Sequence, residues 1–310
     1  MFLTENHKAR AHILMVLLVF LWGLEYVAAK WALESIATLT LVCLKYVLAI
    51  LLIGPIKLKM DGRSFFRKKD IPLFFACALF GEILYFFCEY EAMDYMPVSL
   101  ITVILTFMPA ASIVTEKLLF KRDPTIPMVV GIFICVFGII MVIGADFDIL
   151  FEGRFVGYLL CFGAIFSWNT YNFMTAHLKE KYSAITLTFN QLVCTILLSL
   201  PFALSALPKP EDMTMPVVGG ILFLGFISAG VGFLVYVYAL GVLGPTTMAV
   251  YSNFLPVTAT LFGWILLGEL IGGIQLMGGV IVILAGYVVI KEKAKVDKKR
   301  LEVLSDDRET

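Results

Sequence analysis

The chain has 310 residues, of which 60% are hydrophobic and only 15% are charged. Soluble domains are about 45–50% apolar and about 25% charged, so this composition, with a mean hydropathy of +0.93, excludes an ordinary soluble protein. It predicts an all-α membrane protein. The formal net charge of +0 gives no reason to expect nucleic acid as a partner.

A helix needs roughly 20 apolar residues to cross the hydrocarbon of a bilayer. In chain order, we identify ten such runs, joined by short connections. The first run lacks a small-residue cleavage site, so it is interpreted as a spanning helix rather than a signal peptide. The ten runs are 12–31, 38–57, 72–92, 97–118, 127–144, 156–176, 185–205, 217–240, 246–267 and 273–290.

Lys and Arg gather in alternate connections and at the C-terminus. The opposite set holds only Arg154 and Lys209, with Lys30 near a helix end. Because basic residues favour the cytoplasmic side, we expect both termini to be cytoplasmic, in a plasma (bacterial inner) membrane. Residues 293–310 are then a charged cytoplasmic tail. The basic connections are 57–69, 117–122 and 179–181.

The second half of the chain repeats the first. EAMDYMPVSLITVILTFMP, residues 91–109, aligns with YALGVLGPTTMAVYSNFLP, residues 238–256, so that Pro109 corresponds to Pro256 at an offset of 147. Each proline removes a backbone hydrogen bond within its apolar run. Their paired placement predicts two hinges.

Five spans in each half is an odd number, so the two halves must lie in opposite orientations across the membrane. The predicted fold is therefore ten transmembrane helices as two inverted five-helix repeats, residues 1–147 and 148–292. Secondary transporters with this plan place the substrate near the midplane, between the repeats.

Four ionisable residues lie well inside the predicted spans: Glu25, within FLWGLEYVAAKW, and Lys45, Glu82 and Glu89. A charge at a helix centre costs roughly 2.5–3.5 kcal/mol, so these side chains should face the bundle interior. Lys45 and one carboxylate could form a pair that only neutralises itself, and the partner is left open. One lysine cannot neutralise three carboxylates. At least one of them should therefore be able to exchange a proton for a cationic group.

Aromatic and amide side chains surround these charges in the sequence. Glu82, Tyr85 and Glu89 fall at i, i+3 and i+7, on one helix face, and Trp22 and Glu25 form a similar stripe. Such a lining suits an organic cation or an ammonium group, although interface aromatics and ordinary helix–helix contacts would give the same pattern. The second half contributes the candidates Trp168, Tyr171, Asn172 and Tyr251.

Together, FLWGLEYVAAKWAL, EAMDYMP, YALGVLGP and ILLGELIGGIQLMGGVIVILAG resemble the drug/metabolite transporter superfamily, in its ten-span EamA group. The resemblance implies cytoplasmic termini, a central cavity lined mostly by helices 1, 3, 4, 6, 8 and 9, and peripheral helices 5 and 10. Family members often carry a small or amide residue where Glu25 stands. The first repeat has Lys121 and Arg122 where the second keeps the family-like Gly268 and Glu269, so Glu269 is expected to be a structural residue at a helix end.

The leading hypothesis is a secondary transporter that exports small metabolites, such as amino acids or related amines, in exchange for protons. Glu25 would be the coupling carboxylate, with Glu82 and Glu89 as alternatives. The expected partners are a small-molecule substrate, protons and membrane lipids, and the chain would act as a monomer or homodimer. A carrier without proton coupling is the alternative within the same class.

Two other classes fit the sequence less well. An intramembrane lipid-modifying enzyme would usually show a DDxxD or HExxH pair, and neither is present. A non-transporting scaffold or sensor would not need buried carboxylates. The six cysteines lie in apolar runs without a CxxC motif, and no GxxxxGK[ST] loop occurs. We therefore expect no enzyme activity, no cofactor and no metal.

Overall fold

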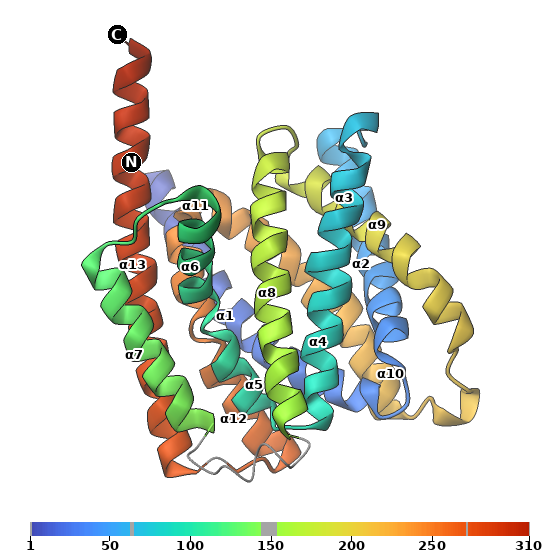
Figure 1. Cartoon of the computed structure of the whole chain (residues 1–310). Helices are drawn as coiled ribbons and strands as arrows, with labels where there is room; N and C mark the ends of the chain where they lie inside the picture. The colour runs from blue at the N-terminus through green and yellow to red at the C-terminus, as the bar shows by residue number, and fades with distance from the viewer. Residues whose placement is uncertain (1, 63–64, 144–153, 271, 310) are drawn as a thin grey trace.

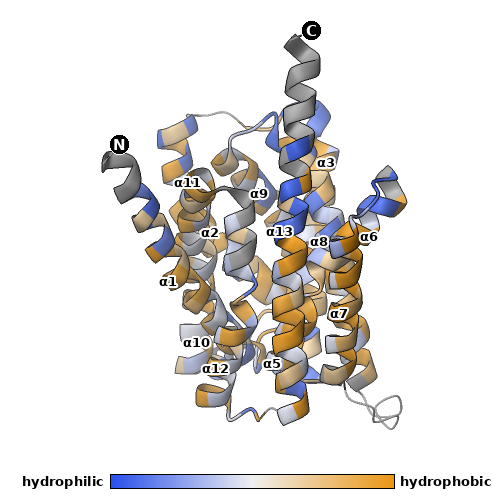
Figure 2. Cartoon of the chain, turned by 90° about the vertical axis from the view of Figure 1, so that its left-hand side faces the viewer, coloured by the Kyte–Doolittle hydropathy of each residue, from blue (hydrophilic) through white to orange (hydrophobic). Residues whose placement is uncertain are grey.

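The computed structural model describes residues 2–62, 65–143, 154–270 and 272–309, and within these ranges the chain forms helices and no strand. Backbone groups cannot find hydrogen-bond partners in lipid, so apolar segments of this kind satisfy them within helices. Polar residues gather toward the ends of the bundle, and apolar residues fill its middle (Figure 2). The predicted all-α membrane fold is confirmed.

The first half contains five helical passages, two of them composite. Their bounds are α1 Phe2–Leu33; α2 Thr38–Asp61; α3 Ile71–Ala78, continued by the π-helical segment η2 Leu79–Leu84 and by α4 Tyr85–Glu91; α5 Val98–Leu105 followed by α6 Met108–Phe120; and α7 Ile126–Ile143.

The second half repeats this order, again with composite passages. Its bounds are α8 Arg154–Lys179; α9 Ala184–Ser205; α10 Met215–Leu222, continued by the π-helical segment η6 Phe223–Val231 and by α11 Gly232–Ser252; α12 Leu255–Leu267; and α13 Gly273–Glu309. α1 and α8, the first helices of the two halves, run in opposite directions, and both chain ends lie at the same end of the bundle (Figure 1).

Three details of the predicted spans need correction. Among the described residues, seven helices are long and apolar enough to cross a membrane, whereas α7 and α12 contain only shorter apolar stretches. α8 is 26 residues long but carries the polar run SWNTYN. The expected break between residues 240 and 246 does not form, since α11 continues unbroken to Ser252. The tenth helix is also longer than its predicted apolar run 273–290, because α13 runs to Glu309.

The internal repeat is visible in the backbone conformation as well as in the sequence. Lys121 directly follows α6 and Gly268 directly follows α12, 147 residues apart, and both residues adopt the left-handed conformation, with φ of 53° and 68°. The N–H that follows each end bonds back to an equivalent carbonyl, Arg122 to Glu116 and Glu269 to Gly263. A lysine adopts this conformation at a cost of roughly 1–2 kcal/mol. The two repeats therefore share the same backbone geometry here, although one has Lys121 where the other has Gly268.

Pro109 and Pro256 lie at matching helix interruptions. Each is the second residue of its helix, α6 or α12, directly after a break at residues 106–107 or 253–254. Proline suits the first turn of a helix because no partner is lost there. The paired breaks are where the sequence placed hinges, and hinge motion itself stays a prediction.

The halves interlock through exchanged helices. α1 of the first half packs against α10, α11 and α12, and α8 of the second half packs against α3, α4, α5 and α6. α2 packs against α9, and α7 pairs with α13 along one side of the bundle (Figure 1). Apolar side chains on α7 and α13, such as Phe133 and Leu284, are exposed, as expected of peripheral helices that face lipid. A side chain in the bundle interior therefore meets residues of both halves.

Two neighbouring glycines test this packing. A Cβ on Gly220 would lie 2.6 Å from the backbone oxygen of Ala28 on α1, whereas a Cβ on Gly219 would have no neighbour within 4 Å. We expect Gly220→Ala to lower the free energy of unfolding by about 1–3 kcal/mol, because a backbone oxygen cannot move aside alone. Gly219→Ala should be neutral or stabilising by up to about 1 kcal/mol through helix propensity. Equilibrium unfolding in mixed micelles compares the two, and equal effects would contradict this close contact.

Candidate functional site

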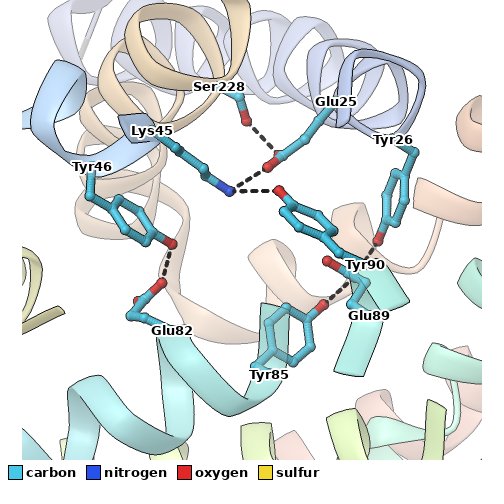
Figure 3. A network of polar contacts seen from close by, with 9 residues as sticks. All are labelled: Glu25, Tyr26, Lys45, Tyr46, Glu82, Tyr85, Glu89, Tyr90 and Ser228. Carbon is cyan, nitrogen blue, oxygen red and sulfur yellow. Dashed lines mark hydrogen bonds and ion pairs between the residues drawn. The ribbon is translucent and has the colours of Figure 1, made fainter. Parts of the chain in front are cut away.

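The four ionisable residues predicted inside the membrane converge in the bundle interior (Figure 3). Lys45 of α2 and Glu25 of α1 form an ion pair, with Nζ 2.7 Å from Oε1 and side chains that are 3% and 15% exposed. Ser228, in the π-helical segment η6, donates to the other oxygen of Glu25 at 2.5 Å. Glu25 is thus the carboxylate that pairs with Lys45, which the sequence left open. Residues from both halves of the chain contact this ion pair.

The ammonium group of Lys45 has two further neighbours. Its Nζ lies 3.7 Å from the centre of the Phe86 ring and donates to the Tyr90 hydroxyl at 3.3 Å. A desolvated cation above an aromatic face gains on the order of 2 kcal/mol. A carboxylate, a ring and a hydroxyl therefore surround Lys45, and its charge is compensated within the protein.

The other two carboxylates have neutral partners. Glu89 is buried, and its Oε1 accepts from the hydroxyls of Tyr26, at 2.9 Å, and Tyr85, at 2.6 Å. Glu82 accepts from Tyr46. We call this group the carboxylate cluster, and as the structure describes it, it holds three carboxylates and one lysine. Its members are Glu25, Tyr26, Lys45, Tyr46, Glu82, Tyr85, Glu89, Tyr90 and Ser228.

The local structure of the third passage explains why its two glutamates face different partners. Tyr85 and Glu89 share one turn of α4, whereas Glu82 belongs to the π-helical segment η2. A π-helical turn is wider than an α-helical turn, and such segments are frequent at functional sites. Glu82 points toward α2 and Glu89 toward α1 (Figure 3). The simple i, i+3, i+7 stripe therefore predicted the shared interior face but not this division.

An aromatic wall extends the cluster toward α8. Trp168 packs against Tyr85 with ring centres 4.9 Å apart, and Tyr171 packs against Trp168 at 5.0 Å. A Cβ on Gly81, the residue before Glu82, would lie only 2.3 Å from the Tyr171 ring. Tyr171 also donates to Gln191 of α9 at 3.2 Å. Aromatic faces therefore border the helix between Glu82 and Glu89.

The remaining predicted residues make other contacts or are exposed. Trp22 packs against Tyr236 of α11, with ring centres 5.7 Å apart. Tyr251 forms a hydrogen bond with His12 at 2.8 Å. His12 lies thirteen residues before Glu25 on α1, which is about 20 Å along a helix. Asn172 is exposed. The structure thus brings together seven of the ten predicted lining residues, and Trp22, Tyr251 and Asn172 lie outside that group.

Sequence reasoning missed five residues of the cluster region. Tyr26 and Tyr90 directly follow Glu25 and Glu89 in the chain, and Tyr46 follows Lys45, so an adjacent tyrosine was the available signal. Ser228 is 203 residues from Glu25 and has no such signal. The missed residues are Tyr26, Tyr46, Phe86, Tyr90 and Ser228.

A second polar contact lies at the end of the bundle opposite the termini. Glu269, after α12, forms an ion pair with Lys30 at 3.1 Å. It also accepts from the backbone N–H groups of Val98 and Ser99, at 3.1 and 3.3 Å, at the start of α5. A carboxylate at a helix N-terminus satisfies free N–H groups and complements the helix dipole. Glu269 therefore ties together α1, α5 and α12, in agreement with a structural role at a helix end.

A metal site would need a different arrangement. Within the part of the chain that the structure describes, no group of three or more His, Cys, Asp or Glu side chains could hold a metal ion. The carboxylate cluster instead offers hydrogen-bond acceptors, one compensated cation and aromatic faces. Chemically, it can bind a proton or an ammonium group.

Apolar helices in two inverted halves, with ionisable side chains buried between them, define an integral membrane protein of the transporter class. The chain belongs to the EamA-like transporter family, which matches residues 9–144 and again residues 155–291.

Several relatives match over most of their length. An uncharacterized transporter of Archaeoglobus fulgidus is 25% identical over 281 residues, which cover 91% of this chain and 99% of the relative. A probable amino-acid metabolite efflux pump of Salmonella typhimurium is 24% identical, covering 89% and 93% of the two chains. A solved crystal structure matches with a TM-score of 0.64 at 16% identity, over 91% of this chain and 98% of that one, which supports the fold alone.

Proposed function

We propose that the protein is a secondary transporter that exports small organic amines, such as amino acids or related cationic or zwitterionic metabolites, in exchange for protons. The observation that carries this proposal is the carboxylate cluster, with three carboxylates and one lysine at the interface of two inverted halves. Membership of a transporter family supports transport rather than catalysis.

Exchange follows from the unequal compensation of the three carboxylates. Glu25 has Lys45 as its counter-ion, whereas the described hydrogen-bond partners of Glu89 are tyrosine hydroxyls. An uncompensated buried charge is costly, so Glu89 is most stable with either a proton or a cationic group. Because the proton and the cationic substrate compete for Glu89, the movement of one across the membrane is coupled to the movement of the other. The titratable groups that face Glu89 are Tyr26 and Glu25 of α1, Lys45 of α2, Tyr85 and Tyr90 of α4, and Cys161 of α8.

Alternating access is the mechanism that we attach to this site. The cluster joins α1, α2 and α4 of one half to η6 of the other, so a relative movement of the halves would change its exposure. The paired interruptions before Pro109 and Pro256 are candidate pivots.

Direction and location rest on charge and on relatives. The Lys- and Arg-rich connections α2–α3 and α8–α9 lie at the same end of the bundle as the termini (Figure 1), which we assign to the cytoplasm of a plasma (bacterial inner) membrane. The Salmonella typhimurium relative is named as an efflux pump for amino-acid metabolites, which favours export. Lipids surround the bundle, which acts as a monomer or a homodimer.

Flux through reconstituted full-length protein tests this function. Proteoliposomes would be loaded with pooled amino acids, polyamines and quaternary amines, and efflux would be measured with and without a pH gradient. We expect amine efflux that accelerates when the trans side is acidic. Empty liposomes are the control. Efflux that ignores the gradient would favour a carrier without proton coupling, and the absence of any amine flux would refute the proposal.

A further inference from the structure

We propose that the preferred substrate is an aliphatic diamine or polyamine, with one ammonium group at Glu82 and a second at Glu89. This inference rests on the proposed function, and it narrows the substrate class at the same site. A transporter selective for amino acids would instead recognise both the amino group and the carboxylate of its substrate. Three features of the cluster support it.

The first feature is a pair of similar carboxylate sites on one helical passage. Glu82 accepts from Tyr46, and Glu89 accepts from Tyr26 and Tyr85. Both hydrogen bonds to Glu89 reach Oε1, so in the described structure its Oε2 carries no protein hydrogen bond. Glu89 follows Glu82 by seven positions, which corresponds to about 10 Å at the rise of an α-helix. Two separated carboxylates with neutral donors match two separated ammonium groups.

The second feature is independent of the acids and points to a cationic chain between them. The aromatic wall runs from Tyr171, which packs on Gly81 next to Glu82 in the chain, through Trp168 to Tyr85, which donates to Glu89. Aromatic faces attract ammonium groups and also cover methylene groups. Glu82 and the three aromatic side chains are only half-buried, although Glu82 and Tyr85 point into the bundle (Figure 3). These four side chains are therefore not fully covered by protein.

The third feature is the absence of a free cation for a substrate carboxylate within the cluster as described. Lys45 is 3% exposed and already engages Glu25, Tyr90 and Phe86. An α-carboxylate would have to displace Glu25 from it and would approach Glu82 and Glu89 as a like charge. A diamine leaves the Lys45–Glu25 pair intact.

Three compounds with the same five-carbon chain separate these possibilities. Pentylamine has one ammonium group, cadaverine has two, and lysine is cadaverine with an added carboxylate. For the full-length protein in liposomes, at concentrations below saturation, we expect cadaverine flux to exceed pentylamine flux by about tenfold, since one charge-assisted contact is gained. Lysine flux should be lower than cadaverine flux.

Two variants complete the test. Glu82→Gln should reduce the ratio of cadaverine to pentylamine flux to about one, because only one carboxylate remains for an ammonium group. Glu91→Gln is the matched control: Glu91 lies at the end of the same passage, bonded to Thr38 and outside the cluster, and should keep the wild-type ratio. If Glu82→Gln does not fold, the wild-type ratio alone decides.

Each failure has a distinct signature. Equal wild-type flux of pentylamine and cadaverine would overturn the diamine assignment while leaving amine transport in place. A cadaverine preference that survives in Glu82→Gln would also overturn it. Lysine flux above cadaverine flux would show that the carboxylate is recognised. If pentylamine, cadaverine and lysine all show no flux, with or without a pH gradient, the proposed function is overturned together with this inference.

Discussion

Replacing Glu89 with Gln is expected to abolish the response of amine flux to a pH gradient and to lower the apparent affinity for amines by about 10- to 100-fold. A hydrogen bond to a charged group contributes about 1.5–3 kcal/mol, and 1.4 kcal/mol corresponds to tenfold. Glutamine keeps the acceptor for Tyr26 and Tyr85 but can neither ionise nor release a proton. Flux into proteoliposomes at several imposed pH gradients measures both effects.

Glu25→Gln is the informative comparison, because Glu25 was the leading coupling candidate on sequence grounds. Since Glu25 is paired with Lys45 and Ser228, we expect its substitution to leave a pH response while weakening transport, through an uncompensated lysine. The double variant Glu25→Gln/Lys45→Met removes both charges and should recover part of the lost flux. A pH response that persists in Glu89→Gln and vanishes in Glu25→Gln would reverse these roles.

Removal of the Glu269 side chain is expected to destabilise the bundle by about 2–3 kcal/mol. Glu269→Ala leaves the first N–H groups of α5 without their acceptor and Lys30 without its counter-ion. Loss of a helix cap costs about 1 kcal/mol, and loss of a charged hydrogen bond costs about 1.5–3 kcal/mol. The Glu269 side chain is only 7% exposed, so water replaces these contacts poorly. Equilibrium unfolding in mixed micelles gives the difference in free energy.

Glu211→Ala is the matched control for this second prediction. Glu211 forms an ion pair with Lys209 at 3.6 Å, and both side chains are more than 70% exposed. Exposed pairs contribute about 0–1 kcal/mol, so this variant should unfold almost as the wild type does. Equal losses in Glu269→Ala and Glu211→Ala would mean that the contact to α5 contributes little.

The sequence by itself determined the class of fold. Long apolar runs can satisfy their backbone in lipid only as helices, and an internal repeat with an odd number of spans requires inverted halves. The matched prolines, Pro109 and Pro256, marked the helix interruptions correctly because proline acts locally on the backbone. The same local logic failed at residues 240–246, where α11 continues through an expected break. There, helix–helix packing decides whether a weak local stop signal is used.

Only the tertiary structure decided which side chains of the site contact one another. Sequence identified Glu25, Lys45, Glu82 and Glu89 as interior residues, since a charge in lipid must turn inward. It left the partner of Lys45 open, because electrostatic pairing depends on distances between helices and not on spacing within one. Ser228 reaches Glu25 from the other half of the chain, and the π-helical segment turns Glu82 away from Glu89. Periodicity reports which face a residue occupies, while contacts between faces are set by how the two inverted halves pack.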